Sequence, residues 1–404
     1  MNLFILEAKR VLKTKNTFIL LIIIFLLSII TAYMPISFES CSYIDSKGDT
    51  IYLKGIEAIR YKKEIQSIID GDVTYEKLSS ALEAYQNVIG DYGSPESIEF
   101  PDSIYLKDIL PVKPLLNLLT RTYNGELMDI DADDINKFYE ENKKLLKEKM
   151  DDIDSNENSQ TQAINMYNNV DKPFKQYSGY STNSFDYVMI FGFLLVLLCT
   201  VIVALTFSVE YETWADNILR CTKYGRYKLA FTKIIVAFII SIMTYIVCMS
   251  VHLVILNFAF GGEAMNTSLQ MLFSPISLSP LNLGETLIIL VIGGFLSLLA
   301  TVSYTLYISV KYKTSSTSYI IAIIMCFLPM VLYALFDSNW LASILPTSSV
   351  ALQGNLFYSL TGWNFLYIGE ISIWSPYIII LSATIEIPIF LILAVRAYIK
   401  HQVS

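Results

Sequence analysis

The chain has 404 residues, of which 54% are hydrophobic and only 16% charged, and its formal net charge is −8. A water-soluble protein of this length needs a more highly charged exterior, so the composition indicates an integral membrane protein. The charge is divided unevenly, because residues 36–184 carry 27 acidic and 16 basic side chains, a net −11. No basic face with interleaved aromatic residues lies outside the apolar segments, which excludes nucleic acid as a partner.

Residues 1–35 predict an interfacial helix followed by the first membrane span. At about 100° per residue the stretch 3–15 has two faces, an apolar one with Phe4, Ile5, Ala8, Val11 and Leu12, and a polar one with Glu7, Lys9, Arg10, Lys13 and Thr14. Such a helix suits the inner membrane surface; a basic flank that only sets topology is the alternative. The apolar run that follows is long and "ITAYM" is a poor cleavage site, so we interpret it as an uncleaved span.

Six apolar segments are long enough to cross about 30 Å of hydrocarbon, at about 17–35, 186–208, 229–258, 284–308, 317–336 and 376–398. Thirteen basic residues lie outside 36–184, and a six-span arrangement puts them all on one side: Lys9, Arg10, Lys13, Lys15, Arg220, Lys223, Arg226, Lys228, Lys233, Lys311, Lys313, Arg396 and Lys400. The short opposite loops carry Glu263, Glu285, Asp337 and Glu370 and no base. The positive-inside rule therefore predicts a multi-pass cell-membrane protein with both termini in the cytoplasm.

The same topology places residues 36–184 outside the cell as an exterior domain, which we expect to be mainly helical. Apolar residues recur every three or four positions in "IEAIRYKKEIQSIID" and "TYEKLSSALEAYQNVI", "PVKPLLNLLTRTYNG" begins with prolines and ends at a glycine, and a charged helix is predicted at about 132–150. The polar stretch 151–184 is expected to lead straight into the second span. Cys41 is the one cysteine in this domain, so packing rather than an internal disulfide must hold it together.

One acidic spacing in this domain is similar to a calcium-binding loop. Positions 1, 3, 5 and 12 of the EF-hand pattern are matched by Asp129, Asp131, Asp133 and Glu140. However, Asp134 stands where the loop needs glycine, and Asn136 where an apolar residue is usual. We therefore favour the alternative that these acids cap and charge the start of a helix, and we expect no bound metal.

Residues 210–233 place charged and aromatic side chains between two apolar segments. Thr213 and Asp216 have the spacing of a helix N-cap and third helical residue, which predicts a short cytoplasmic helix over about 213–223, before Gly225. Tryptophan and arginine dominate many protein interfaces, so these residues suit the docking of a partner protein; they suit an aromatic and basic membrane anchor equally well. The candidate contact residues are Thr213, Trp214, Asp216, Ile218, Leu219, Arg220, Lys223 and Arg226.

Two further features lie towards the C-terminus. Segment 337–375 is apolar but interrupted by proline and glycine, which predicts short interfacial or re-entrant pieces on the exterior side. Glu386, two residues before Pro388, falls in the last span, where a carboxylate is costly unless it is paired or faces water. We expect both residues to line a cavity or to act in gating; a neutral interhelical hydrogen bond is the alternative for Glu386.

An ordered set of residues around the third span resembles ABC type-2 exporter permeases. The set comprises an acidic residue leaving the second span, an Ile-Leu pair in a short helix, and Arg and Lys seven residues apart, here Glu210, Ile218-Leu219, Arg226 and Lys233. Six spans and an amphipathic N-terminal helix extend the resemblance over 1–35 and 186–404. The chain departs from the family at Thr213-Trp214, where Gly-Thr is frequent, and at Tyr224-Gly225, where proline often precedes the arginine.

The resemblance implies that residues 213–223 form a coupling helix that fits a groove on a separate cytoplasmic ABC ATPase. The sequence contains no G-x-x-x-x-G-K motif, so ATP and Mg²⁺ are expected on that partner and no cofactor on this chain. Six spans are half the usual complement, so a second permease copy or a paralogue is expected, with membrane lipids around both. The sequence also lacks a Ser/His/Asp set or zinc cluster, which argues against an enzyme.

The sequence thus predicts an all-α membrane protein that serves as the membrane subunit of an exporter. The expected cargo is hydrophobic or amphipathic, such as a peptide, an antibiotic or a lipid-like molecule. One alternative is an antimicrobial-peptide resistance or immunity complex, and another is a membrane sensor that relays a signal without transport. The exterior domain is expected to form a lid or lateral wall over the outer mouth, with a merely solvated decoration as the alternative.

Overall fold

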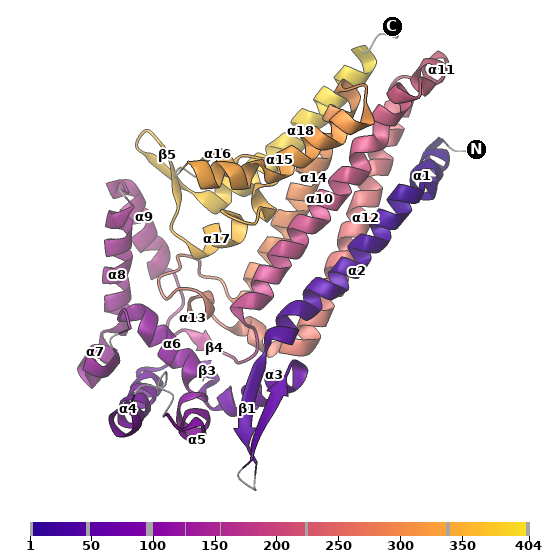
Figure 1. Cartoon of the computed structure of the whole chain (residues 1–404). Helices are drawn as coiled ribbons and strands as arrows, with labels where there is room; N and C mark the ends of the chain where they lie inside the picture. Colours follow the sequence, from indigo (N-terminus) through magenta and orange to yellow (C-terminus); the bar gives the residue numbers. More distant parts are fainter. Residues whose placement is uncertain are drawn as a thin grey trace.

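The computed structural model describes residues 3–45, 49–93, 100–125, 127–153, 155–222, 225–336 and 340–400. Figure 1 shows a bundle of long helices with both chain ends together at one end and a second, mostly helical body at the other. Among the described residues, six helices are long and apolar enough to cross a membrane: α2 (Lys15–Phe38), α10 (Thr182–Glu212), α12 (Tyr227–Phe260), α14 (Leu283–Lys311), α15 (Ser315–Leu335) and α18 (Ser375–Lys400). The prediction of an all-α membrane protein with six spans is confirmed.

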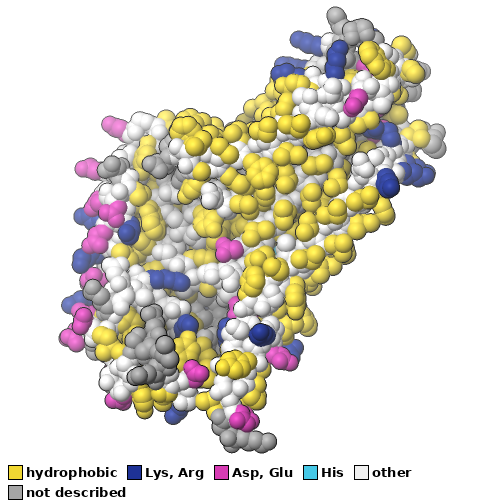
Figure 2. Space-filling model, in the orientation of Figure 1, with side chains coloured by type: hydrophobic (Ala, Val, Ile, Leu, Met, Phe, Trp, Pro, Cys, Tyr) yellow, Lys and Arg dark blue, Asp and Glu magenta, His cyan; other side chains and the backbone are white. Residues whose placement is uncertain are grey.

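Polar residues continue these helices a few positions beyond the predicted apolar segments. α14 begins at a reciprocal cap in which Glu285 N donates to Asn282 Oδ1 at 2.8 Å and Asn282 N donates to Glu285 Oε2 at 3.0 Å. Figure 2 shows apolar side chains over most of the length of the bundle, and basic side chains gathered at the end that carries both termini. A further helix, α1 (Leu3–Lys13), precedes α2 at this base-rich end.

Residues 39–181 form an inter-span domain between α2 and α10. Its main helices are α3 (Ile56–Gln66), α4 (Tyr75–Tyr92), α6 (Lys113–Thr122), α8 (Phe138–Asp152) and α9 (Glu157–Asn168), and its shorter turns are Ser67–Ile69, α5 (Asp102–Ile104), the π-helical Tyr105–Ile109, Leu127–Asp129 and α7 (Ala132–Asn136). The first three main helices lie where the apolar spacing predicts them. Thr74 caps α4, and Pro114 in the first turn of α6 needs no amide hydrogen bond there.

The inter-span domain also contains elements that the sequence did not reveal. A hairpin pairs β1 (Ser40–Ile44) with β2 (Thr50–Lys54), and β3 (Gly71–Asp72) pairs with β4 (Lys175–Gln176). The expectation that 151–184 leads straight into the second span is wrong, because α9 and β4 interrupt it. The physical reason is tertiary packing, since α9 buries Ala163 and Tyr167 against the domain core despite its polar composition.

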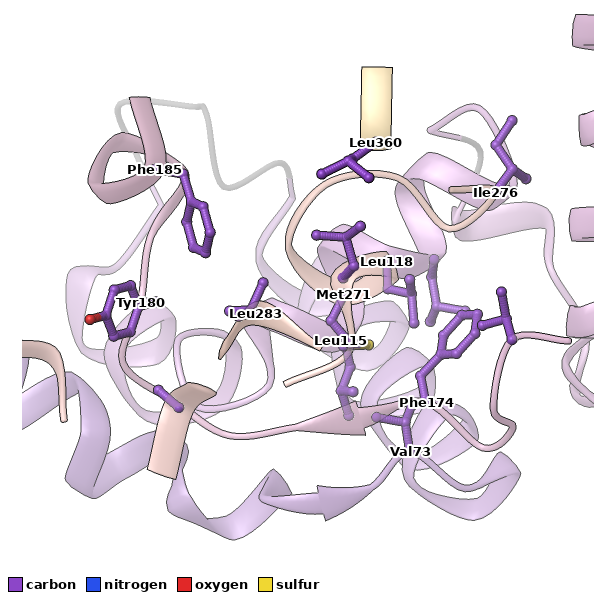
Figure 3. Close-up of a cluster of buried hydrophobic side chains, with 14 of the residues drawn as sticks. Val73, Leu115, Leu118, Phe174, Tyr180, Phe185, Met271, Ile276, Leu283 and Leu360 are labelled. Atoms are coloured by element: carbon purple, nitrogen blue, oxygen red, sulfur yellow. The ribbon is translucent and has the colours of Figure 1, made fainter. Parts of the chain in front are cut away.

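The core of the inter-span domain is continuous with the ends of the membrane helices. Figure 3 shows Val73, Leu115 and Phe174 from the domain in one cluster with Phe185 of α10 and with Leu283 of α14. Hydrogen bonds support the junction, because Ser178 N donates to Asp70 Oδ1 at 3.0 Å, while Tyr177 N donates to Thr267 Oγ1 at 3.0 Å. The two bodies therefore share one hydrophobic core.

The segment between α15 and α18 folds into short pieces that reach into the bundle. They are α16 (Trp340–Ser343), a 3-10 turn (Ser348–Val350), α17 (Leu356–Thr361) and a hairpin of β5 (Phe365–Ile368) with β6 (Ile371–Trp374); two short elements, Glu263–Asn266 and α13 (Leu269–Leu272), join α12 to α14. Ser297 Oγ, halfway along α14, donates to Pro346 O at 2.7 Å. At its other end the hairpin touches α9, where Asn158 Nδ2 donates to Glu370 O at 2.6 Å.

Gly179 lies at the point where the inter-span domain leads into α10. A substitution there tests how tightly the inter-span domain packs against the membrane helices. A Cβ at this position would lie 2.4 Å from Phe260 O and 2.7 Å from Ala264 Cβ. Gly179→Ala is therefore expected to lower the free energy of unfolding by about 1–3 kcal/mol, measured by thermal unfolding of the purified protein. Gly90→Ala in α4, where a Cβ meets nothing within 4 Å, is the control and should be neutral or stabilising. Equal effects of both substitutions would contradict the shared core.

Candidate functional site

The base-rich end of the bundle carries one short helix, α11 (Ala215–Cys221), in the connection between α10 and α12. Its start differs from the prediction. Thr213 is not the N-cap, because its Oγ1 donates backwards to Val209 O at 2.8 Å and the residue ends α10. Trp214 precedes α11 with a φ of 58°, a left-handed conformation that costs a non-glycine residue about 1–2 kcal/mol.

The surface of α11 combines exposed apolar side chains with buried polar ones. Trp214 and Ile218 are 65% and 75% exposed, whereas Leu219 is half-buried and the carboxylate residue Asp216 is buried. Arg226 is exposed where α12 begins. The other two candidate contact residues of this stretch are Lys223 and Arg220. Lys223 and the side chain of Arg220 lie outside the part of the chain that the structure describes.

Behind α11 lies a buried ion network that joins three elements. Lys233, in the second turn of α12, is 0% exposed and is among the largest fully buried side chains of the described protein. Its Nζ donates to Glu7 Oε1 of α1 at 3.0 Å and to Glu210 Oε1 of α10 at 2.5 Å. Arg10 Nη2, on α1, donates to Glu7 Oε1 at 2.5 Å. We call these four residues the end network.

Opposite charges compensate one another in the end network. Burial raises the pKa of Glu7, but the hydrogen bond from Arg10 and the positive charge of Lys233 outweigh it and hold that pKa below its usual value. The network contains two carboxylates and two cations, so it is neutral as a whole. A buried arrangement of this kind tolerates no loss of one partner, because the remaining charge has neither water nor a counter-ion.

Aromatic residues extend the end network towards the connection that carries α11. Lys233 Nζ lies 5.6 Å from the centre of the Phe207 ring, and that ring packs against Tyr398 of α18 with centroids 5.2 Å apart. Tyr398 Oη donates to Gly225 O at 3.1 Å, at the end of the α11 connection. These contacts thus hold together α1, α10, α12, α18 and the residues that follow α11 at Gly225.

The sequence only partly revealed this site. Glu210 and Lys233 belong to the family-like set that the sequence shows, whereas helical projection places Glu7 on the polar face of the N-terminal helix without predicting that it is buried. Helical projection identifies which residues share a face, but it does not show which face another helix covers. Here α12 packs on the side of α1 that carries Glu7. The sequence feature that could have predicted the ion pair of Glu7 and Arg10 is their spacing, since residues three apart lie on one helix face.

Glu386 lies in α18, away from the end network. The side chain is half-buried, and its Oε2 atom is buried without a hydrogen-bond partner among the described residues. The expected polar partner is therefore not observed at this oxygen. Pro388 is exposed on the same helix.

The acidic stretch of the inter-span domain behaves as a helix start. Asp131 is the N-cap of α7, and its amide donates to Asp134 Oδ2 at 3.2 Å. Among the described residues no group of three or more acidic, histidine or cysteine side chains is placed to hold a metal ion, and this covers Asp129, Asp133 and Glu140. The prediction that these acids cap the start of a helix is confirmed at Asp131.

Lys233→Met tests the end network. The substitution leaves the Glu210 carboxylate buried without a cation, whereas Glu7 keeps Arg10, so the free energy of unfolding should fall by about 3–5 kcal/mol. Adding Glu210→Gln removes the uncompensated charge and should recover most of this loss. Thermal unfolding of the purified proteins measures both effects.

The control for this experiment is Lys9→Met, which removes an exposed lysine from α1. It should change the free energy of unfolding by no more than about 0.5 kcal/mol. Failure of Glu210→Gln to rescue Lys233→Met would show that the lysine acts through its packing rather than its charge.

A second pair of variants tests Glu386. Glu386→Met removes a buried oxygen that has no partner, so we expect the free energy of unfolding to rise by about 1–2 kcal/mol. The matched variant Glu285→Met removes a carboxylate that caps α14 and should lower the free energy of unfolding by about 1 kcal/mol. Destabilisation by Glu386→Met to the same degree would mean that the carboxylate has a stabilising partner.

Comparison of the chain with family models, with characterised proteins and with solved structures finds no match.

Proposed function

We propose that the chain is the membrane subunit of an ATP-driven exporter and that a separate cytoplasmic ABC ATPase docks on α11. The observation that carries this proposal is the exposure of Trp214, which directly precedes α11, and of Ile218 within it. The helix α11 projects beyond the apolar part of the bundle at its base-rich end. Large apolar side chains exposed outside the membrane mark protein interaction sites, and tryptophan is prominent among residues that dominate binding.

The attachment of α11 supports a role in transmitting motion. α11 follows α10 almost directly and is tied through Gly225 to Tyr398, while Lys233 locks α10 to α12 and α1. A force on α11 therefore acts on several spans rather than on a loose loop. This is what an ATPase needs in order to change the arrangement of membrane helices.

The orientation and cargo belong to the same proposal. The base-rich end faces the cytoplasm of a cell by the positive-inside rule, which places the inter-span domain outside. A second copy or a paralogue completes the transport path, and the cargo is a hydrophobic or amphipathic molecule. An immunity complex against antimicrobial peptides uses the same architecture, whereas a sensor without an ATPase does not.

The first test is capture of the ATPase. The tagged chain, purified from membranes of its native cells in mild detergent, should bring with it a protein containing the G-x-x-x-x-G-K motif, identified by mass spectrometry. Capture of a histidine kinase in place of any ATPase would support the sensor and overturn the exporter.

The second test locates the contact. Trp214→Ala combined with Ile218→Asp should reduce the amount of captured ATPase by about tenfold or more, because both are large, exposed apolar side chains at the α11 connection. The thermal stability of the variant should stay close to that of the wild type, since both side chains are exposed.

The matched control is Tyr52→Ala, which removes a 74% exposed aromatic side chain from β2 at the opposite end of the molecule. This variant should capture as much ATPase as the wild type. Undiminished capture by the α11 variant would identify α11 as a membrane anchor instead.

A further inference from the structure

A cavity of about 280 Å³ lies where the inter-span domain meets the ends of the membrane helices, and we call it the junction cavity. Its walls come from α3, from α6, from α13 and from the segment 176–182 that leads into α10. This volume is near the lower end of the range for small-molecule sites, roughly 300–1,000 Å³. An adjacent cavity of about 350 Å³ shares Lys62, Gln66 and Lys113 with it.

The junction cavity is positively charged. Its charged lining residues are Lys62, Lys63, Lys113, Arg121 and Glu39. Lys62 Nζ donates to Glu39 Oε2 at 2.7 Å, so this pair cancels and three basic side chains remain. The segment 36–184 around it carries 27 acidic and 16 basic residues, so the cavity has the opposite sign to its own domain.

The three remaining cations are not paired with carboxylates in the described part of the chain. Lys113 Nζ donates to the Tyr105 hydroxyl at 2.7 Å, and Arg121 Nη1 donates to Leu272 O at 3.0 Å. Burial raises the pKa of Asp70, and the charge of Lys63 offsets that rise only in part. The Asp70 carboxylate accepts its hydrogen bonds from Ser178 rather than from Lys63. Arg121 is exposed, and partial desolvation of its guanidinium lowers its pKa.

Two hydroxyl groups of lining residues add unused donors. Tyr180 Oη and Ser181 Oγ are buried and have no hydrogen-bond partner among the described residues. A phosphate group presents several acceptor oxygens and a negative charge, and it forms short, charge-assisted hydrogen bonds with lysine and arginine. An apolar or cationic ligand would leave both the charges and the hydroxyls unsatisfied.

We propose that the junction cavity binds a phosphate group, held by Lys63, Lys113 and Arg121. The cavity is level with the last residue of α2 and the first residue of α10, because Glu39 and Thr182 both line it. The ends of membrane helices lie at the depth of lipid headgroups, so the headgroup phosphate of an anionic lipid is within reach. A soluble phosphate ester has the same chemistry, and the experiment distinguishes the two sources.

The test uses the full-length protein in a nonionic detergent. Phosphatidylglycerol, diacylglycerol and glycerol 1-phosphate are titrated separately, and the rise in unfolding temperature gives the midpoint concentration of each. Stabilisation by phosphatidylglycerol alone identifies a lipid phosphate, and equal stabilisation by glycerol 1-phosphate identifies a soluble one. Diacylglycerol should have no effect, because it lacks the phosphate.

The variant Lys63→Gln with Lys113→Gln should raise the midpoint for the stabilising phosphate by about tenfold or more. Neither lysine has an ion-pair partner to lose, so the double variant is expected to fold. Lys113→Glu changes one exposed position and should also raise the midpoint. Lys143→Gln with Lys147→Gln removes the same charge from exposed positions on α8 and should leave the midpoint unchanged. The proposal is overturned if neither phosphate compound stabilises the wild type, or if both charge variants weaken the effect equally.

Discussion

The position of Lys233 constrains the rest of the α11 end of the molecule. Its ammonium group has no access to water, so its charge must be balanced by groups of the protein itself, and Glu7 and Glu210 provide that balance. The three residues come from three different helices. If α12 moved away alone, Lys233 would lose both carboxylates and Glu210 would lose the cation that donates to it, at a cost of about 3–5 kcal/mol. The position of α11 is fixed as well, because α11 lies in the short connection between α10 and α12.

The two ends of the bundle are held by different interactions. At the α11 end a few charges and hydrogen bonds fix the helices, and such interactions depend strongly on geometry. At the other end the inter-span domain and the spans share a broad apolar core, which is held by non-directional packing rather than by charges. α10 connects the two ends, and 67% of its most apolar 18-residue stretch is buried inside the protein. It is therefore the element best placed to carry a displacement from α11 to the inter-span domain.

Most polar groups within the spans are satisfied by their own helices. Thr200 Oγ1, for example, donates to Val196 O at 2.8 Å, and Thr305 Oγ1 donates to Thr301 O at 2.7 Å. Such bonds within one helix change its stability only slightly, and they do not indicate contacts with other helices or with partner proteins. Among the buried side-chain atoms of the described residues that lack a hydrogen-bond partner, Glu386 Oε2 is the one carboxylate oxygen, and ionisable groups within spans are concentrated at functional sites in membrane proteins.

The sequence by itself determined the membrane class, the six spans and the end of the bundle at which the bases gather. Hydrocarbon thickness sets the length of an apolar helix, and that constraint is read directly from composition. The starts of α4 and α14 also follow from local caps. Only the tertiary structure decided which side of α1 is covered, where α11 begins, and that α9 is a helix at all. These features depend on contacts between residues far apart in the chain, such as Glu7 with Lys233, and a periodic pattern identifies the faces of a helix without naming the neighbour that buries one of them.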